Sequence, residues 1–401
     1  MTTEPTASAP DTVPDTRGFA TRAIHEGQHF DPRTGAVIPP IFMTSTFVQD
    51  GVGGFRDGYE YSRGGNPSRD ALQQQLASLE GGTHAFTFGS GLAAEDALLR
   101  AVLKPGDHVL MGNDVYGGTH RLVSQLHQKW GVEISTADAS DLDAVRAAVR
   151  PNTRILWVET PSNPLMKVAD IAGLAEIGHA AGAVVVADNT FATPYLQQPL
   201  ALGADAVLHS TTKYIGGHSD LVGGAVVTAD ASLAESVGFQ QFAVGAVNSP
   251  FDAWLTSRSL KTLAVRVERH CASAQAVAES LVGHPAVTAV HYPGLPDHPQ
   301  HELAARQMRG GGVPRFGGMV SLQLAGGVPA VHELVGRTRL FQLAESLGGV
   351  ESLVCYPSEM THASVKGTEL AVPEDLLRLS VGLEDAADLI ADLRQALDGL
   401  R

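Results

Sequence analysis

Two residues with reactive side chains follow two successive apolar runs of the sequence. Asp188 comes directly after Ala183–Ala187, and Lys213 comes shortly after Ala206–Leu208. Runs that are apolar at every position are typical of strands buried on both faces, and ligands of open α/β sheets bind at the carboxyl ends of such strands. Burial lowers the pKa of a lysine and frees its amine as a nucleophile. Either residue alone is more simply a turn or loop residue, but together they indicate a lysine that binds pyridoxal phosphate and a carboxylate beside its ring nitrogen.

Polar residues near this lysine and an earlier glycine turn could hold the phosphate. Ser210 and Thr212 flank Lys213 at alternate positions, and Gly89–Ala94 opens a predicted helix whose free N–H groups and dipole favour an anion. The glycine turn also fits the dinucleotide pattern G-x-G-x-x-A, with Asp114 where a ribose-binding acid would fall. A nicotinamide-dependent oxidoreductase is therefore an alternative, although it leaves the lysine unexplained.

Tyr116 and Arg378 are two further candidates. Tyr116 follows the apolar run His108–Met111 and could stack on a planar cofactor or move a proton, although a core or loop role is the simpler interpretation. Arg378 lies inside the apolar run Leu377–Val381, and a buried arginine requires an anionic partner. A substrate carboxylate, bound through two hydrogen bonds, and an internal Asp or Glu are the two alternatives.

The elements that must position these residues alternate between helix and buried strand from Arg69 onward. This alternation predicts an α/β fold with a large, mostly parallel sheet covered by helices on both faces. The hydrophobic pattern of the sequence changes near Phe251, where one long helical stretch runs toward Leu281. Shorter strand-like runs follow, and a last helix is expected over Asp385–Leu400, which together predict a smaller C-terminal α/β domain.

This pattern divides the chain into three parts. Residues 66–264 are expected to form the large cofactor-binding domain, and residues 265–401 the small domain. Residues 1–65 have clustered Pro, Gly and Thr with little periodicity, so they predict an extended arm that needs another surface, with about the first 17 residues disordered.

Composition limits the classes of function. The 401 residues are 44% hydrophobic and 18% charged, with a net charge of −15, which is globular and argues against nucleic-acid or membrane binding. Cys271 and Cys355 cannot form a disulfide framework, and the sequence shows no targeting segment, so a cytoplasmic location is expected. His291, His298 and His301 lack clear ligand spacing, and no metal site is expected.

A set of short motifs in fixed order resembles one family. The chain from about Thr21 to its end is similar to the pyridoxal-phosphate enzymes of cysteine and methionine metabolism, such as cystathionine γ-synthase, cystathionine γ-lyase and methionine γ-lyase. The motifs are Tyr61-Ser62-Arg63, Asn66-Pro67, Ser90-Gly91, Glu159–Pro164, Asp188-Asn189-Thr190, Ser210–Tyr214, Ala344–Gly349, Met360-Thr361-His362 and Arg378–Gly382.

The resemblance implies a pyridoxal-phosphate-dependent transferase fold of type I, similar to aspartate aminotransferase, and a homotetramer built from pairs of active dimers. It assigns catalysis to Lys213, Tyr116 and Asp188. It assigns cofactor binding to these three residues and to Ser90, Gly91, Leu92, Ser210 and Thr212, with Tyr61 and Arg63 supplied by a neighbouring subunit. Arg378, with Asn163 and Ser346, would bind the α-carboxylate of an amino-acid substrate.

The particular reaction depends on weaker signals. Glu60 and Glu345 precede two of the motifs and could attract the distal ammonium of cystathionine, which disfavours methionine γ-lyase, although two solvated glutamates are the simpler alternative. We predict cystathionine γ-lyase, a carbon–sulfur lyase that yields cysteine, 2-oxobutyrate and ammonia. The alternatives are cystathionine γ-synthase, which joins an O-acylhomoserine to cysteine, and a specialised γ-replacement paralogue. Gly310–Arg315 resembles an insertion that could alter substrate choice if it borders the site.

Overall fold

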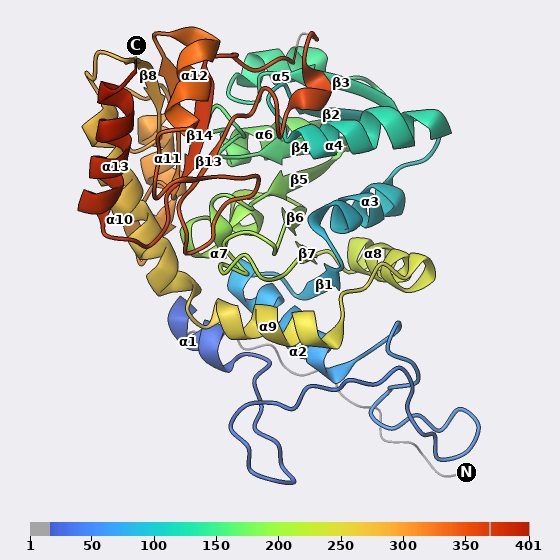
Figure 1. Ribbon diagram of the computed structural model, residues 1–401. Helices are drawn as coiled ribbons and strands as arrows, with labels where there is room; N and C mark the ends of the chain where they lie inside the picture. Colours follow the sequence, from blue (N-terminus) through green and yellow to red (C-terminus); the bar gives the residue numbers. More distant parts are fainter. Residues whose placement is uncertain (1–16, 369, 401) are drawn as a thin grey trace.

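The computed structural model describes residues 17–368 and 370–400 (Figure 1). An N-terminal segment extends from one end of a body that contains a seven-stranded and a five-stranded β-sheet. In this segment, α1 (Phe19–His25) is followed by loops and isolated bridges up to α2 (Pro67–Glu80), which agrees with the lack of periodicity. The disorder predicted for about the first 17 residues concerns positions outside the described residues, apart from Arg17.

The larger sheet has seven strands in the order β1-β7-β6-β5-β4-β2-β3. Neighbouring strands from β6 to β3 are parallel, whereas β7 is antiparallel to both β6 and β1. This confirms the large, mostly parallel sheet. The strands are β1 (His84–Phe88), β2 (His108–Gly112), β3 (Glu133–Ala137), β4 (Thr153–Glu159), β5 (Val184–Asp188), β6 (Ala206–His209) and β7 (Gly224–Thr228).

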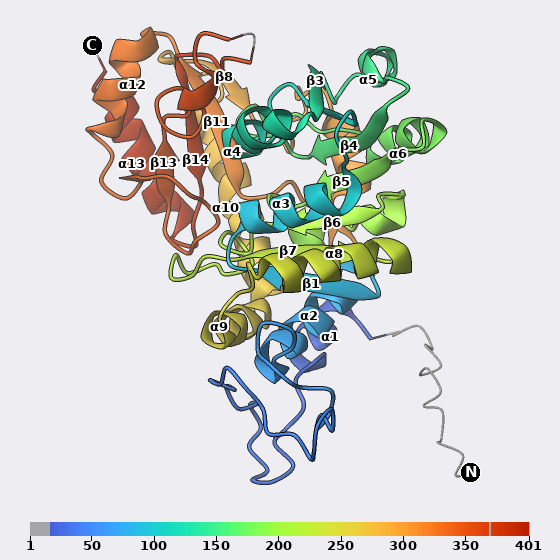
Figure 2. The ribbon, with the colours of Figure 1, turned by 90° about the vertical axis from the view of Figure 1, so that its right-hand side faces the viewer.

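Helices cover both faces of this sheet. Its central strands are apolar at successive positions, and successive side chains point to opposite faces, so both faces are apolar and are buried by helices. The helices of this region are α2, α3 (Gly91–Val102), α4 (Gly117–Arg121), α5 (Leu142–Ala148), α6 (Ile171–Ala180), α7 (Thr193–Leu196) and α8 (Ala231–Val244). On one face, α3 and α8 pack on Val186 and Val226 (Figure 2). On the other face, α2 packs on Val207 and Val227, and α6 packs on Val185.

The smaller sheet lies in the C-terminal part and has the order β12-β13-β14-β11-β8. Its elements are β8 (Val287–His291), α11 (His301–Gln307), β11 (Met319–Leu324), α12 (Gly327–Val335), β12 (Gln342–Leu343), β13 (Leu353–Cys355), β14 (Leu376–Ser380) and α13 (Ala386–Asp398). The strand pairs are antiparallel except β12 with β13. Apolar residues of α10 (Leu263–Leu281) and α13 are buried in the core of this domain, among them Ala274, Leu389 and Leu393.

The long helix expected from Phe251 toward Leu281 is instead two helices. These are α9 (Pro250–Leu260) and α10, which are separated at Thr262. Thr262 bonds back to the Ser259 carbonyl through both its backbone N–H and its hydroxyl, at 3.1 Å each. These local bonds replace the helical pattern, as threonine hydroxyls commonly do at helix ends. The domain boundary predicted at residues 264 and 265 falls within the first turn of α10 and stays a prediction.

The expected insertion forms a small hairpin. The strands β9 (Arg309–Gly310) and β10 (Val313–Pro314) pair with each other, and Gly311 and Gly312 turn between them with φ of 62° and 82°. Such values favour glycine, which explains the glycine run.

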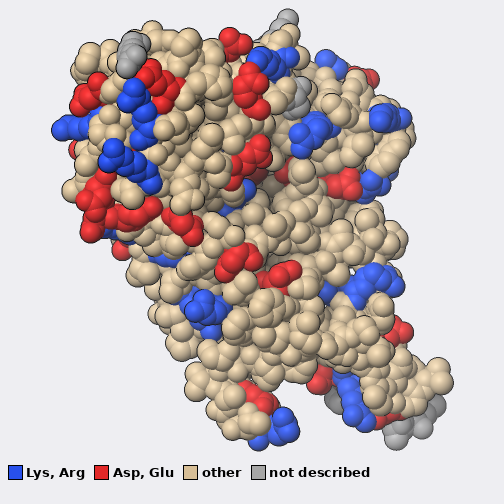
Figure 3. Space-filling model, viewed as in Figure 1, with Lys and Arg blue, Asp and Glu red and all other residues tan. Residues whose placement is uncertain are grey.

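The surface carries charges of both signs. Lys and Arg are interspersed with Asp and Glu on the face shown in Figure 3. Among the helices of the described residues, none is both long enough and apolar enough to cross a bilayer.

Candidate active site

A cavity of about 350 Å³ lies at the carboxyl ends of β4, β5 and β6, where loops of the smaller sheet face the larger one. This is the edge at which the sequence places a ligand site. The residues that line it are Ser90, Gly91, Leu92, Glu95, Tyr116, Glu159, Asn163, Asp188, Thr190, Phe191, Ser210, Thr212, Lys213, Val222, Glu345, Ser346, Leu347, Thr361 and Arg378.

Lys213 brings an amine into this cavity from the loop after β6. Its Nζ donates a hydrogen bond to Ser346 Oγ at 2.8 Å. Burial, and then the nearby charge of Arg378, lower the pKa of Lys213 from its usual 10.5 to about 8. A large fraction of the amine is therefore neutral near pH 8, which is the form that attacks an aldehyde.

Asp188 is the last residue of β5 and is only 8% exposed. Burial raises the pKa of this carboxyl group, whereas hydrogen bonding from Thr190, whose N–H lies 3.0 Å from Oδ1, and the charge of His209 lower it. Two more buried carboxyl groups, Glu95 and Glu159, line the same cavity, and burial raises the pKa of each well above its usual range. Of the three carboxyl groups, Asp188 at the end of β5 is the one suited to pair with a positively charged ring nitrogen of a ligand.

Tyr116 is held at the cavity by its backbone. Its N–H donates to Glu159 Oε2 at 2.8 Å, which fixes the start of α4 relative to the end of β4. Burial, and then the charge of Glu95, raise the pKa of the Tyr116 hydroxyl. The hydroxyl therefore keeps its proton at neutral pH and can donate it.

The N-terminus of α3 forms a cradle for an anion. The Ser90 side chain accepts a hydrogen bond from the Ala93 N–H at 3.1 Å and so caps the helix, which begins at Gly91. A Cβ at Gly91 would lie 3.0 Å from the Ser210 Cβ and 3.1 Å from its Oγ, so only glycine leaves this approach open. Thr212 is fixed beside it by two hydrogen bonds with Gly223, at 3.1 and 3.2 Å. Helix dipole, backbone N–H groups and hydroxyls together suit a phosphate.

Arg378 reaches the cavity from β14 and is 2% exposed. Its Nη1 donates to Asn163 Oδ1 at 2.7 Å, and its Nη2 donates to the Ser346 carbonyl at 3.1 Å. Its Nε is buried without a hydrogen-bond partner among the described residues. Neither of these two contacts neutralises the guanidinium, so of the two alternatives left by the sequence a bound carboxylate is favoured over an internal Asp or Glu.

Ser346 joins the two sides of the site. Its hydroxyl contacts Lys213 and its carbonyl contacts Arg378, while its own φ is 96°. A non-glycine residue rarely adopts this left-handed region, and such strain tends to persist at functional sites.

Three predicted residues lie away from this cavity. Glu60, Tyr61 and Arg63 belong to the N-terminal segment and are exposed, with Tyr61 at 47%. Arg63 donates to the Phe242 carbonyl at 2.8 Å and lies over the Phe242 ring. The positions of Tyr61 and Arg63 in a neighbouring subunit's site, and the substrate-binding role of Glu60, therefore stay predictions.

The other candidates also have defined places. Asp114 does not line the cavity and accepts a hydrogen bond from Ser162 instead. Among the described residues no group of His, Cys, Asp and Glu is arranged to hold a metal ion. The hairpin of β9 and β10, which contains most of Gly310–Arg315, borders a different surface pocket, near Arg22 and Tyr195.

Sequence reasoning missed several residues of the cavity wall. Glu95 lies one turn after Gly91 on α3, so helical periodicity places both on one face. Glu159 ends β4, as Asp188 ends β5, and the strand-end rule that found Asp188 would have found it. The remaining missed residues are Thr190, Phe191, Val222, Leu347 and Thr361.

The fold and the site together define a pyridoxal-phosphate-dependent enzyme of fold type I. The profile described as Cys/Met metabolism PLP-dependent enzyme matches residues 20–398, and the chain belongs to this family. The expected family and cofactor are thereby confirmed.

Individual relatives cover nearly the whole chain. Cystathionine γ-synthase of Mycobacterium leprae is 59% identical, over 95% of this chain and 97% of the relative. Cystathionine β-lyase of Lactococcus lactis subsp. cremoris is 49% identical, over 94% and 98%. The crystal structure of metB from Corynebacterium glutamicum superposes with a TM-score of 0.94 at 52% identity, over 96% of this chain and 99% of that one.

Proposed function

We propose that the chain catalyses γ-replacement as a cystathionine γ-synthase, joining an O-acylhomoserine to cysteine. The observation that carries this choice is the 59% identity to a γ-synthase along 95% of the chain. The sequence favoured the γ-lyase reaction and gave the synthase reaction as an alternative. Both reactions belong to this family. The similarity to a named synthase favours the second.

The residues of the cavity support this reaction. Pyridoxal phosphate, when bound, supplies an electron sink for the negative charge that forms at a substrate carbon as it loses a proton. Lys213, with a pKa of about 8, would take and return protons at the substrate α and β carbons. Tyr116 would serve as a proton donor or acceptor near the leaving group, and Asp188 would pair with the ring nitrogen.

Substrate binding would rest on two charged residues. Arg378, oriented by Asn163 and Ser346, would hold the α-carboxylate of the amino acid that donates the γ carbon. Glu345 is exposed at the cavity wall and would attract the ammonium of the incoming cysteine. After the α and β protons are removed, the bond between the γ carbon and the acyl oxygen would break, and the acyl carboxylate would leave with the bonding electrons. The cysteine sulfur would then bond to the γ carbon as the thiol gives up its proton, and protons would return to the β and α carbons.

The test compares the two reactions in one preparation. Purified holoenzyme is incubated with O-succinyl- or O-acetylhomoserine plus cysteine, and separately with L-cystathionine alone. We expect cystathionine to form faster from an acyl donor than 2-oxobutyrate is released from cystathionine. Faster release of 2-oxobutyrate and cysteine from cystathionine would instead establish the γ-lyase, and release of pyruvate and homocysteine would establish a β-lyase.

The assembly is proposed as a homotetramer in which Tyr61 and Arg63 reach the phosphate of a neighbouring subunit. The N-terminal segment that carries them exposes several large apolar side chains, including Phe30, Val37 and Val52. Exposed apolar surface of this extent marks an interaction site. Light scattering should give the mass of four chains, and Arg63→Ala should weaken cofactor binding without unfolding the subunit.

A further inference from the structure

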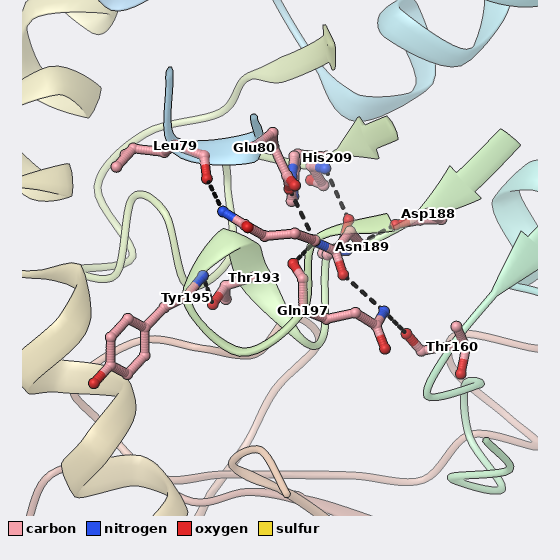
Figure 4. Close-up of polar contacts among 12 residues, drawn as sticks. Leu79, Glu80, Thr160, Asp188, Asn189, Thr193, Tyr195, Gln197 and His209 are labelled. Carbon is pink, nitrogen blue, oxygen red and sulfur yellow. Dashed lines mark hydrogen bonds and ion pairs between the residues drawn. The ribbon is translucent and has the colours of Figure 1, made fainter. Parts of the chain in front are cut away.

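A buried polar network lies behind the cofactor site and is not used by the proposed mechanism (Figure 4). Its centre is Glu80, the last residue of α2, which accepts a hydrogen bond from Nε2 of His209, the last residue of β6. Glu80 is 0% exposed and His209 is 1% exposed. Their contact is an ion pair when the imidazole is protonated. A buried carboxylate needs such a partner, because isolated charges are strongly disfavoured away from water.

The same oxygen of Glu80 also binds the residue next to Asp188. Asn189 Nδ2 donates to Glu80 Oε1 and to the Gln197 carbonyl, at 2.9 Å each, and Asn189 Oδ1 accepts from Gln197 Nε2 at 2.9 Å. Glu80 thus connects the ends of β5 and β6, the two strands that deliver Asp188 and Ser210 to the cavity.

A second set of contacts continues from this junction to the cavity wall. The Ser210 N–H, adjacent to His209, donates to Thr190 Oγ1 at 2.9 Å. The Thr190 N–H in turn donates to Asp188 Oδ1 at 3.0 Å. His209 Nδ1 has no hydrogen-bond partner among the described residues, so Glu80 is the polar group that orients the ring.

Electrostatics add a second effect. Asp188 shares its cavity with Glu95 and Glu159, and burial followed by the charge of Asp188 raises the pKa of both of these carboxyl groups. Burial raises the pKa of Asp188 itself, and a positive charge on the His209 ring lowers it.

We propose that Glu80 and His209 are positioning residues, which fix the orientation of Asp188 and keep it in the charged form that binds a protonated ring nitrogen. The proposal rests on the cofactor role of Asp188 but not on the choice between synthase and lyase, because its test uses the cofactor without substrate. A preparation that binds cofactor but lacks γ-replacement would leave this test intact.

The experiment measures two properties of Glu80→Gln, His209→Gln and the double variant. The first is the dissociation constant of pyridoxal phosphate for the resolved protein, and the second is the pH midpoint of the visible absorbance of the holoenzyme. Less positive charge at the ring nitrogen favours retention of the proton at the group that joins Lys213 to the cofactor. We therefore expect weaker binding and an upward midpoint shift of about one pH unit, a tenfold change in protonation ratio.

The other titratable or charged groups near this part of the site remain unchanged in these variants. They are Glu95 from α3, Tyr116 at the start of α4, Glu159 from β4, Lys213 from the loop after β6, Glu345 from the loop before β13, Cys355 from β13 and Arg378 from β14. If Glu80 and His209 act as a unit, the double variant should match the single variants rather than add to them.

A matched control is His108→Gln. His108 is also buried in the large sheet, with hydrogen bonds to Thr153 and Ser135, but it starts β2 at the edge opposite the cavity. It should change neither property. Folded Glu80→Gln and His209→Gln proteins with the wild-type midpoint would overturn the electrostatic part.

The variant Asn189→Ala separates the orientation of Asp188 from the electrostatic effect of Glu80 and His209. It removes the contact between Glu80 and the end of β5 but keeps both charged residues. We expect weaker cofactor binding with no shift of the midpoint. Wild-type affinity in this variant would overturn the positioning part, and this result is decisive even if the charge-removing variants do not fold.

Discussion

Lys213 Nζ lies 2.8 Å from Ser346 Oγ, so a loop of the smaller sheet holds the reactive amine that follows a strand of the larger sheet. The same serine accepts a hydrogen bond from Arg378 through its carbonyl. One residue thus links the amine that would bind the cofactor to the guanidinium that would bind the substrate. The two sheets must keep their relative position for the site to be complete.

The lowered pKa of Lys213 gives a prediction about cofactor attachment. The neutral amine is the reactive form, and it becomes the major form above pH 8 rather than above pH 10.5. The rate of cofactor attachment to resolved protein should therefore rise with pH around a midpoint near 8. Stopped-flow absorbance across pH 6.5–9.5 measures this rate.

Lys213→Ala is the control for this profile. It should bind the cofactor without forming the borohydride-reducible bond and should lose turnover. A wild-type midpoint near 10 would show that burial does not lower the pKa of the amine as described.

Arg378→Lys should weaken substrate binding and leave the cofactor in place. Lysine keeps the charge but loses the planar group that is oriented by Asn163. Loss of one charge-assisted hydrogen bond costs about 1.5–3 kcal/mol, or roughly 10- to 150-fold in kcat/KM. Steady-state kinetics with the acyl donor, beside the visible spectrum, separate the two effects.

Arg100→Lys, at a half-buried ion pair with Asp96 on α3, should keep wild-type kinetics. A changed cofactor spectrum in Arg378→Lys, with unchanged KM, would move Arg378 from substrate binding to cofactor binding.

Much of the fold could be predicted because the central strands are apolar at every position. The strand β3, Glu133–Ala137, was missed because it is a half-exposed edge strand with polar residues. The break at Thr262 was missed because neither Gly nor Pro marks it, and local bonds to Ser259 end α9 instead.

The site was partly predictable for a similar reason. Strand ends place Asp188 and Lys213 directly, and a charged residue inside an apolar run indicates Arg378. The family motifs add Asn163 and Ser346, and the structure brings all five residues to one cavity. Residues that meet only through hydrogen bonds between distant segments carry no local signal. Glu80 and His209, distant in sequence and joined only by the fold, are of this kind.

Glu345→Gln tests the selection of an amino acid with an ammonium far from the reacting carbon. Glu345 is exposed at the cavity wall, so solvent weakens its attraction for the ammonium. We expect KM for cysteine or cystathionine to rise a few-fold, about 0.2–1 kcal/mol, with little change in kcat. Glu351→Gln, on the same loop but outside the cavity wall, is the control. An equal effect in both variants would argue for a general change of surface charge.

Gly91→Ala should damage phosphate binding specifically. The new Cβ would meet the Ser210 Cβ at 3.0 Å and its Oγ at 3.1 Å, where the phosphate cradle has to stay open. Overpacking of this kind costs about 1–3 kcal/mol, so we expect cofactor affinity to fall by roughly 5- to 150-fold. Equilibrium binding of pyridoxal phosphate to the resolved protein measures this loss. Gly89→Ala is the matched control, because its Cβ would lie 3.7 Å from the nearest atom, an ordinary contact. Pyridoxal without its phosphate should bind equally to both variants, and a selective loss of pyridoxal binding in Gly91→Ala would show that the glycine serves the ring rather than the phosphate.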